Sequence, residues 1–488
     1  MATPYVDNAV KTIGIISVIL FLKYIFRTVY VAFFGPLSKI PGPKLSALSA
    51  IPLLFKGTKG KRWHWYQREL RPKYGKIVRI GPDMVLVSDR DIVKQIIVKE
   101  DWPKGEFYGM YRAAPHLHTL FSTTDKAFHK QRRRLLAPAF SIKYIQSLEP
   151  YMAMCIRNLN DKIDSLIQES SPNGAVIDLY RMIVNTTLDS IGETAFGSSF
   201  NMIREGDHPL PKEVMVELSR RVLRNGFPIL KPFVKSNRYL YDFSSELIRR
   251  RRQEVGARRK DILQIILDAG EGEGEEALTD VDIYEQIIEF IIGGSDTTSF
   301  STFFALIMLL THPSKLHKII EELDNEFVDL PRNELPNHGR LKNLPYLNAV
   351  INETLRLWPI TLDGGSGRSP TEDRIVNGVL FPKGTLIVAN YYALHHSAEY
   401  WGENVNEFIP ERWFNDDIPH DAFYPFSAGS RNCIGQNFAL LEMRLIISSL
   451  LRRFKFEDIP GQDYSDIVQY LTPSLAKDEY HVRAWNRP

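Results

Sequence analysis

The sequence predicts a mainly helical protein with a small β-rich part and a separate apolar helix at its N-terminus. Amphipathic helical patterns fill most of residues 145–270. A longer element of about thirty residues begins at an N-cap candidate, Thr279, and ends before Pro313. Within residues 76–87, two short β-branched runs flank the sequence Gly-Pro-Asp, which is the pattern of a β-hairpin.

Composition indicates a folded, reducing-compartment protein. The chain has 488 residues, enough for one large catalytic domain or two or three ordinary ones. Its 44% hydrophobic and 24% charged residues indicate a globular core. The net charge of +3 is too small to suggest nucleic acid binding. The two cysteines, Cys155 and Cys433, argue against a disulfide framework.

The N-terminus has the pattern of a membrane anchor. The uninterrupted apolar run, residues 13–22, is shorter than the ~20 residues that a spanning helix needs. Residues 10–34 are long enough if Lys23 or Arg27 snorkels to the interface. Little positive charge precedes the run and no clear small-residue cleavage site follows it, which argues against a cleaved signal peptide.

A proline-containing hinge follows the apolar stretch. Pro41 and Pro43 make this segment stiff and non-helical. The chain after residue 45 contains no linker that would split it into independent domains. The sequence therefore predicts an N-terminal anchor over residues 1–36 and one folded domain over residues 37–488.

The loop at residues 426–435, FSAGSRNCIG, carries Cys433 directly before an apolar helical run. Free backbone N–H groups and the positive end of the helix dipole favour a thiolate at that place. One thiolate without a neighbouring cysteine or histidine is a poor zinc site. It is a good single axial ligand for haem iron. A buried structural cysteine is the alternative.

The centre of the long helix, IIGGSDTTS at residues 291–299, combines two glycines with two threonines. Each glycine costs about 1 kcal/mol of helix stability relative to alanine. A threonine can bond back to a carbonyl one turn earlier and bend the helix. This local penalty suggests a groove over a bound ligand, with packing glycines as the alternative. Five residues share roughly one face by their spacing: Phe290, Gly294, Thr297, Thr298 and Thr302.

The cysteine loop resembles the haem-binding signature of the cytochrome P-450 family, F-x-x-G-x-R-x-C-x-G. The matching residues are Phe426, Gly429, Arg431, Cys433 and Gly435. The resemblance implies haem b as cofactor, with Cys433 as the iron ligand and Arg431 at a haem propionate. It also implies that Phe426 packs beside the thiolate and that Gly435 belongs to the cofactor site.

The glycine-threonine segment is similar to the family's oxygen-activation motif, [A/G]-G-x-[D/E]-T. By that resemblance Gly294 makes room for dioxygen, and Asp296 and Thr297 deliver protons to it as the catalytic residues. We expect the substrate pocket to be lined by these motif neighbours and by two residues that follow Pro359: Phe290, Gly294, Thr298, Ile360 and Leu362.

A structural motif of the family is matched by Glu353 and Arg356, which are three residues apart on one helix. The resemblance implies that this pair is buried and is joined by Arg412 of the PERW sequence. Its implied role is to lock the loop that precedes the cysteine.

Three further residues are expected at the haem propionates. The family has a tryptophan followed four residues later by an arginine. Arg133 matches the arginine, whereas His129 stands in the tryptophan's place, which is a departure. Histidine can still donate a hydrogen bond to a propionate. Arg368 is the candidate for another propionate arginine, although it lies a residue or two further along the chain than in many members.

The resemblance covers about residues 36–488 and implies a microsomal member of fungal character. The implied fold is a large helical domain with a small β-rich region, made by the hairpin and by strands after residue 375. The implied activity is a monooxygenase that inserts one atom of O2 into a lipophilic substrate, with a steroid as the first hypothesis. Fatty acids, terpenoids and xenobiotics are the other substrate classes.

The resemblance also implies partners and a location. Electrons come from NADPH through NADPH-cytochrome P-450 reductase, with cytochrome b5 as a second candidate donor. The catalytic domain is expected on the cytosolic face of the endoplasmic reticulum membrane. An acidic reductase suits a basic patch, for which we expect Lys126, Lys130, Arg132, Arg134, Arg444, Arg452 and Arg453.

Two other classes stay open. A haem sensor or electron carrier requires no proton relay, so Thr297 after Asp296 argues against it. A haem-thiolate isomerase or dehydratase uses no external electrons, and such relatives usually alter the Asp-Thr pair that is intact here.

Overall fold

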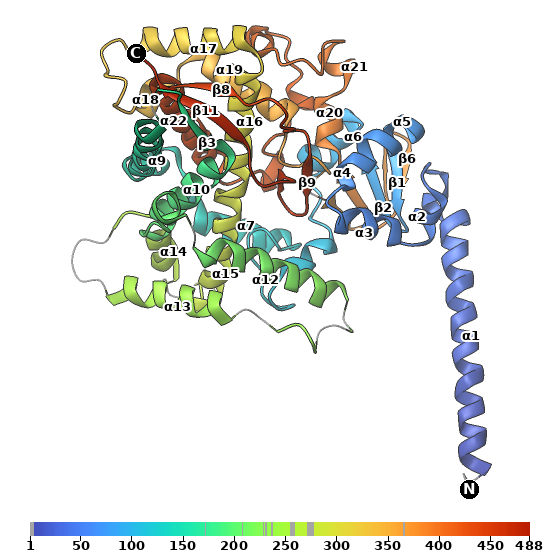
Figure 1. The fold of residues 1–488 in the computed structure, drawn as a ribbon. Coiled ribbons are helices and arrows are strands. Elements are labelled where there is room, and N and C mark those ends of the chain that lie inside the picture. Colours follow the sequence, from blue (N-terminus) through green and yellow to red (C-terminus); the bar gives the residue numbers. More distant parts are fainter. Residues whose placement is uncertain are drawn as a thin grey trace. The chain divides into compact units, whose positions relative to one another are not determined.

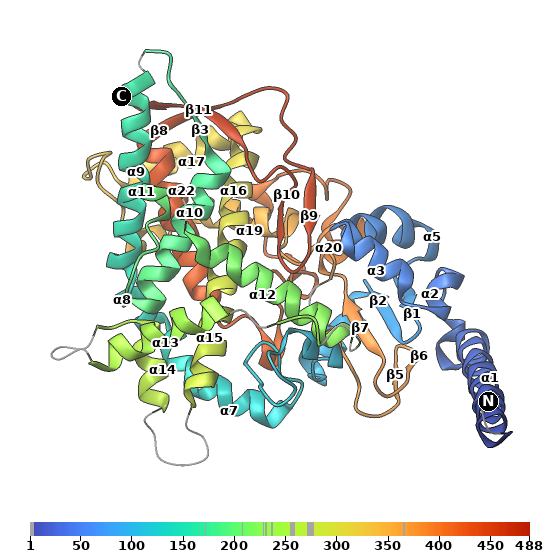
Figure 2. The ribbon, with the colours of Figure 1, turned by 60° about the horizontal axis from the view of Figure 1, so that its bottom comes forward.

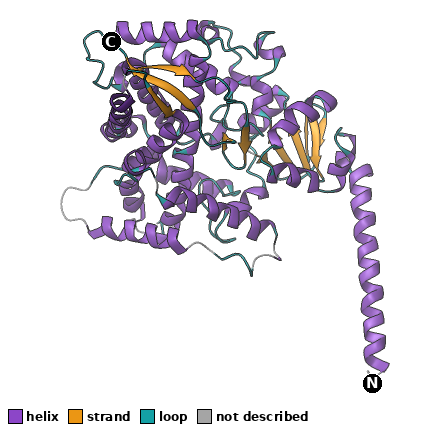
Figure 3. Cartoon of the chain, viewed as in Figure 1, coloured by secondary structure: helices purple, strands orange, loops and turns teal. Residues whose placement is uncertain are grey.

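A computed structural model describes residues 4–170, 172–206, 208–227, 229, 232–235, 238–253, 259–270, 278–364 and 367–488. The chain divides into two compact units: Met1–Gly105 with Asp363–Asn390, and Glu106–Leu362 with Tyr391–Pro488. Helices make up most of the described chain, and the strands form small sheets (Figure 3). The acidic run 271–276, which its sequence predicts to be a solvated connector, lies outside the described residues.

The first unit contains a four-stranded sheet in the order β1-β2-β7-β4. Figure 1 labels the first two of these strands, β1 and β2. The antiparallel hairpin of β1 (Ile77–Gly81) and β2 (Met84–Val87) confirms the hairpin predicted from the sequence. Strand β7 (Leu386–Ala389) runs parallel to β2, and β4 (Gly367–Arg368) runs antiparallel to β7.

A second, separate hairpin joins β5 (Arg374–Val376) to β6 (Val379–Phe381). Both turn residues have positive φ, 49° at Asn377 and 76° at Gly378. Asn-Gly is the pair that such a tight turn favours. The short helices of this unit are α2 (Lys44–Leu48), α3 (Ile51–Thr58), α4 (Arg62–His64), α5 (Arg71–Tyr74) and α6 (Arg90–Lys94).

The N-terminal helix α1 (Pro4–Phe34) is long and apolar enough over Thr12–Phe34 to cross a membrane, judged by length and composition. Its C-terminal end is attached to the sheet of the same unit. Ala32 is buried, and its carbonyl accepts a hydrogen bond of 2.8 Å from the guanidinium of Arg79 in β1. Arg79 also donates to the carbonyls of Gly81 and Pro82. The last turn of the apolar helix therefore belongs to the folded unit.

The second unit is mainly helical. Its helices are α7 (Lys126–Leu136), α8 (Ile142–Ser147), α9 (Glu149–Ser170), α10 (Leu179–Ile191), α11 (Met202–Glu205), α12 (Pro209–Gly226), α13 (Arg238–Gln253), α14 (Ile262–Gly270), α15 (Asp280–Gly294), α16 (Asp296–Leu310), α17 (Pro313–Glu326), α18 (His338–Leu341), α19 (Pro345–Leu357), α20 (Tyr391–His395), α21 (Ala398–Trp401) and α22 (Gln436–Arg453). Helix α16 is buried from Thr298 to Leu309 and packs against α10, α19 and α22 (Figure 2). It is the central helix of this unit.

Two small sheets complete the second unit. Strand β11 (His481–Asn486) lies between β3 (Ala175–Asp178) and β8 (Phe454–Asp458), antiparallel to both. Strands β9 (Ile467–Gln469) and β10 (Pro473–Leu475) form a hairpin. Strand β3 lies inside the stretch predicted to be mostly helical. Its pairing partner is about 300 residues away, so no local sequence pattern announces it.

Candidate functional site

The loop before α22 presents Cys433. Its backbone N–H donates to the carbonyl of Phe426 at 2.9 Å, which closes the loop into a turn. Gly429 has φ of 72°, a left-handed conformation that glycine adopts without strain. A Cβ atom on Gly435 would lie 3.9 Å from the Cys433 sulfur, so this glycine leaves the sulfur uncovered on that side. The cysteine side chain is exposed.

The electrostatic setting of Cys433 differs from the expectation. Although the Cys433 side chain keeps an exposed part, desolvation by the protein packed around the loop raises the pKa of its thiol, whereas the Gly435 N–H and the Arg133 guanidinium lower it by less. The helix N-terminus thus acts in the predicted direction, but its effect is smaller than that of desolvation. A coordinating metal cation deprotonates a thiol outright. Ligation to a metal would therefore stabilise the thiolate, which the surrounding protein alone does not do.

Two arginines tie the cysteine loop to α7. Arg133 of α7 donates to both the carbonyl and the side-chain oxygen of Asn432, each at 2.7 Å. In the opposite direction, Arg431 donates to the carbonyls of Thr123 and Asp125 at 3.1 and 3.3 Å, just before α7 begins. The sequence predicts propionate contacts for both arginines. The structure shows that each also holds protein atoms, and Asn432 carried no signal in the sequence.

His129 and Arg368, two other propionate candidates, are both buried. His129 lies on α7 one turn before Arg133. Arg368 of β4 is 1% exposed, and none of its three guanidinium nitrogens has a hydrogen-bond partner among the described residues. A buried cation without an acceptor is strongly unfavourable. A carboxylate ligand such as a haem propionate would satisfy it, so this residue fits the cofactor that the cysteine loop suggests.

The predicted long helix is in fact two helices with a break at Ser295. Helix α15 starts with the predicted N-cap, Thr279, in a reciprocal capping box with Asp282. At the break the hydroxyl of Ser295 donates to the carbonyl of Ile291 at 2.6 Å. The hydroxyl of Thr297 donates to the carbonyl of Gly293 at 2.7 Å. These back-bonds are the bending mechanism that the sequence predicted.

The two glycines before the break, Gly293 and Gly294, have different surroundings. A Cβ atom on Gly294 would lie 2.6 Å from the Cδ1 atom of Ile191 in α10, so this glycine allows close helix packing. No described atom lies within 4 Å of a Cβ on Gly293, which is exposed. Gly293 therefore faces open space, and Thr297 follows it by one turn.

The residues of the predicted pocket face differ in their exposure. Thr298 and Thr302 are buried within the protein, because the open side of the helix runs through Gly293 and Thr297 instead. Leu362 is also fully buried. Ile360 is only partly buried, and its carbonyl accepts a hydrogen bond from the amide of Gln469 at 3.3 Å.

The aromatic side chain of Phe290 in α15 contacts a second aromatic ring. It packs edge-to-face on Phe140 with ring centroids 5.3 Å apart. A further group of aromatic rings lies in the segment before α7 and surrounds Phe121, which contacts Tyr108 at 5.2 Å and Tyr111 at 5.7 Å. Tyr108 and Tyr111 lie in η4 (Glu106–Tyr111), and Phe121 lies in the loop that links η4 to α7.

Asp296 points away from the helix toward the C-terminal hairpin. One carboxylate oxygen accepts a hydrogen bond from the hydroxyl of Thr472 at 3.1 Å, and the other from Ser295 at 3.4 Å. Burial raises the pKa of Asp296 despite the lowering effect of these two donors. A carboxyl group with a raised pKa holds a proton more readily. Thr472 was not predicted, because no sequence pattern links it to residues 176 positions earlier.

The structure brings Glu353, Arg356 and Arg412 together in a buried network. The guanidinium of Arg356 donates to both Glu353 oxygens at 2.9 and 2.8 Å. Arg412 donates to Glu353 at 2.9 Å. The Ile409 N–H and the Trp413 indole N–H also donate hydrogen bonds to the Glu353 carboxylate, each at 3.0 Å. Trp413 was missed from the sequence.

Arg356 extends this network into the chain that leads to the cysteine loop. It donates to the carbonyls of His395 and Val405 at 2.8 and 2.7 Å. The His395 ring accepts the N–H of Tyr424 at 2.8 Å. Since Tyr424 lies two residues before Phe426, the network holds the backbone from which the loop starts.

Most of the predicted basic patch is not a surface. Arg452 is buried and donates to carbonyls of the segment after α17. Arg444 donates to Asn348, while Arg453 and Arg132 pair with Asp164 and Asp282. Of the seven residues of the predicted patch, the three with exposed side chains are Lys126, Lys130 and Arg134 on α7.

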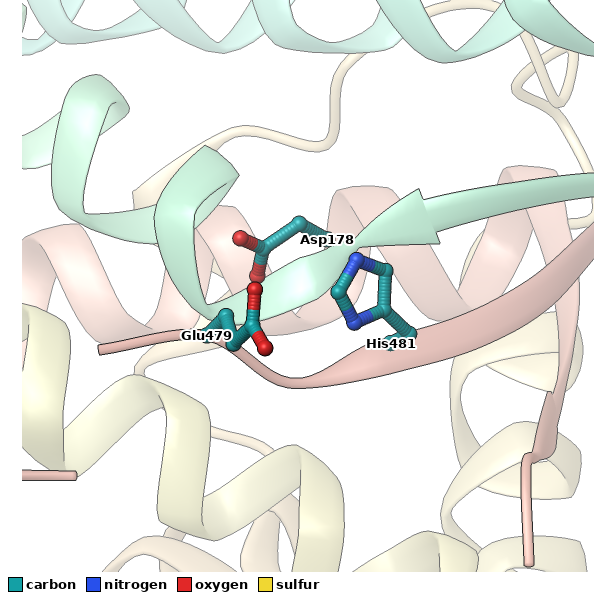
Figure 4. Close-up of side chains that lie close together, drawn as sticks. All are labelled: Asp178, Glu479 and His481. Carbon is teal, nitrogen blue, oxygen red and sulfur yellow. The ribbon is translucent and has the colours of Figure 1, made fainter. Parts of the chain in front are cut away.

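Two other polar groups lie elsewhere in this unit. Asp178, Glu479 and His481 have potential ligand atoms within 4.8 Å of one another where β3 and β11 pair (Figure 4). Asp178 caps α10 and accepts the Tyr480 N–H at 3.0 Å, so strand pairing explains this group. Glu442 of α22 is fully buried beside Ser190, and burial raises its pKa to about 8 against a smaller lowering effect of the Ser190 hydroxyl.

Comparison with known proteins identifies the family. Residues 41–480 match the model of the Cytochrome P450 family. The chain is 37% identical to cytochrome P450 monooxygenase acrD of Aspergillus aculeatus, over 89% of this chain and 88% of the relative. It is 34% identical to cytochrome P450 monooxygenase LUC2 of a Fusarium species, over 97% and 93% of the two chains. Human cytochrome P450 3A7 is 28% identical over 92% and 91%. The chain belongs to the cytochrome P450 family, and it is a monooxygenase that uses haem b with a cysteine thiolate as the iron ligand.

Proposed function

We propose that Cys433 is the thiolate ligand and that this chain inserts oxygen into a lipophilic small molecule over the break at Ser295. The observation that best supports this proposal is that the cysteine loop and the glycine-threonine segment adjoin two helices that pack against each other. Helix α22 starts right after the cysteine loop and packs against α16, which starts at Asp296. The open side of that break carries Gly293 and Thr297.

The residues have distinct tasks in this proposal. Bound haem supplies the chemistry that activates O2 and transfers one oxygen atom. Gly293 leaves space beside the helix, in the role that the family resemblance implies for Gly294. The Thr297 hydroxyl, which donates to the Gly293 carbonyl at rest, rotates to donate a proton in the opened space. The buried Asp296 carboxyl, whose pKa is raised, holds the proton that replaces it.

Arginines bind the cofactor's carboxylates. Arg368 offers an unused guanidinium. Arg133 and Arg431 join the cysteine loop to α7 and add positive charge beside it. His129 lies on the same helix. Glu353, Arg356 and Arg412 act on the loop through the backbone and do not touch the cofactor.

The lipophilic substrate is supported by the aromatic side chains near the break. Phe290 and Phe140 pack together, and Tyr108, Tyr111 and Phe121 form a second cluster. Such surfaces bind apolar molecules through area and ring stacking. The names of the fungal relatives state a monooxygenase and no substrate, so a steroid has no support beyond the sequence hypothesis.

We further propose that helix α1 anchors the protein in the endoplasmic reticulum membrane and that residues 37–488 form the cytosolic catalytic domain. The length and composition of Thr12–Phe34 support the anchor. The electron donor is an NADPH-dependent reductase, with cytochrome b5 as an additional donor. Lys126, Lys130 and Arg134 on α7 offer the positive charge that an acidic partner recognises.

One experiment tests the proposal and separates it from the alternatives. Cys433→Ala should abolish the thiolate-type carbon monoxide spectrum of the reduced protein, and Cys155→Ala, its matched control, should retain it. Persistence of the spectrum in Cys433→Ala would refute the ligand assignment. With a reductase and a panel of lipophilic compounds, NADPH consumption should depend on the compound. Conversion of a compound without NADPH would indicate an isomerase or dehydratase, and binding without conversion would indicate a sensor.

A further inference from the structure

A cluster of polar side chains at the C-terminal end of α12 fastens that helix to the aromatic segment before α7. Asn225 donates its side-chain N–H groups to the carbonyls of Arg112 and Met110 at 2.8 and 3.1 Å. Arg224 donates to the carbonyl of Ala113 at 2.6 Å. No strand of the described residues pairs with the segment 109–113, and side chains of α12 satisfy carbonyls that a sheet would otherwise satisfy.

A buried charge network holds the same helix to α15. Arg221 forms a two-pronged ion pair with Glu285 at 2.6 and 2.9 Å and pairs with Glu217 at 3.0 Å. All three side chains are at most 4% exposed. Arg221 also reaches the carbonyl of Tyr111 at 3.4 Å. Breaking a buried pair leaves an uncompensated charge, so α12 cannot move from α15 without a large penalty.

The far end of the segment is attached to α15 close to the break. The carboxylate of Glu289 accepts hydrogen bonds from the hydroxyl of Thr119 and from the N–H of Phe121. Glu289 lies one turn before Gly293 on the same helix face. The segment 106–122 is therefore held at both ends, and its second attachment lies one turn from the open space at Gly293.

We infer that Asn225, Arg224 and Arg221 are specificity-determining positioning residues, which fix the segment 106–122 at one distance from the helix break and so limit the size of molecules that enter. This inference rests on the proposed function, because it takes the space at Gly293 as the substrate side. None of the three residues touches the reacting atoms. Their effect passes through backbone carbonyls of the segment.

The test uses Asn225→Asp in the full-length haem protein. Aspartate has the same shape and cannot donate, so it turns two hydrogen bonds into contacts between oxygens. Asn343→Asp is the matched control, since the exposed Asn343 donates to the carbonyl of Gly339 at 3.2 Å in α18 and the turn that follows it. Asn225→Ala, which removes the donors without adding charge, serves if the aspartate variant does not fold.

The probes are imidazole and a bulky azole, ketoconazole, whose binding is followed by the haem difference spectrum. In Asn225→Asp the association rate of the bulky azole should rise roughly fivefold or more, with imidazole within about twofold of wild type. Asn343→Asp should leave both rates unchanged. Equal changes for the two azoles, or none, would overturn the inference.

Hydrogen exchange gives a readout that requires no ligand. Amides in residues 106–122 should exchange faster in Asn225→Asp than in wild type or in the control. Unchanged exchange there would refute the fastening itself. The carbon monoxide spectrum of the wild type reports separately on the proposed thiolate ligand, so a failure of the proposed function is distinguishable from a failure of this inference.

Discussion

Replacing Glu353 by glutamine tests whether the buried network stabilises the unit that carries the cysteine loop. The Glu353 carboxylate accepts five hydrogen bonds, three of them from arginine side chains, and both Glu353 and Arg356 are fully buried. Glutamine removes the charge that balances two guanidinium groups and turns its own N–H groups toward donors. Loss of one partner of a buried ion pair costs about 3–5 kcal/mol.

The expected change in melting temperature follows from this free energy and from the unfolding entropy, which depends on the size of the unit. Unfolding entropy of about 2.1 cal/mol/K per residue over roughly 350 residues gives about 0.7 kcal/mol/K. Glu353→Gln should therefore lower Tm by about 4–7 °C. The matched control is Glu411→Gln, since Glu411 binds Lys315 and Lys318 near the surface. Each surface pair contributes about 0–1 kcal/mol, so loss of the two pairs should cost the control about 3 °C or less.

The assay is thermal unfolding of the haem-loaded protein followed by far-ultraviolet circular dichroism. The reduced carbon monoxide spectrum, recorded before heating, reports whether each variant holds its haem through the thiolate. If Glu353→Gln and Glu411→Gln melt within about 1 °C of each other, the network does not stabilise this unit as the geometry indicates.

Three further changes have defined outcomes. Thr297→Ala should keep haem but lower product formed per NADPH consumed by about tenfold or more, with hydrogen peroxide released instead, because a proton donor is lost; an unchanged ratio would leave this threonine a packing role. Deleting residues 1–28 or 1–36 should shift the protein toward the soluble fraction, but only the longer deletion should lower Tm, since it removes the carbonyl that Arg79 binds; equal melting of the two truncations would contradict the attachment. Glu442→Gln should stabilise the protein more at pH 8 than at pH 5, as measured by urea unfolding. The Glu442 pKa is raised to about 8 in the folded state and is near 4.3 when unfolded, so its contribution is fully present below pH 4.3 and declines by up to roughly 1.4 kcal/mol per pH unit until about pH 8; a difference independent of pH would show that Glu442 is not held protonated.

Short-range patterns in the sequence predicted the elements that short-range physics determines. The hairpin around Gly81, the N-cap at Thr279 and the back-bonding threonine at residue 297 were all readable from neighbouring residues. The division of the long element into two helices could not be predicted from neighbouring residues, because helix propensity does not say whether a glycine pair bends a helix or ends it. The surroundings of the glycine pair come from another helix, since Ile191 of α10 approaches Gly294 closely.

Side-chain partners at long range could not be read from one sequence. Thr472 binds Asp296 and Trp413 binds Glu353 across 176 and 60 positions. The same limit explains the error about the basic patch. Arg452 and Arg444 are charged in sequence, and only the fold shows that carbonyls and an asparagine satisfy them in the interior.

The pairing of β3 with β11 has a consequence for how the protein is made. Tyr480 and Asp178, which meet there, are 302 positions apart. At a synthesis rate of about 5–20 residues per second, β3 leaves the ribosome roughly 15–60 s before its partner strand exists. The nascent chain must carry an unpaired strand edge throughout that interval, and the sheet can close only after residues 481–486 have emerged. A premature stop just before residue 481 would thus leave a long chain that never completes this sheet.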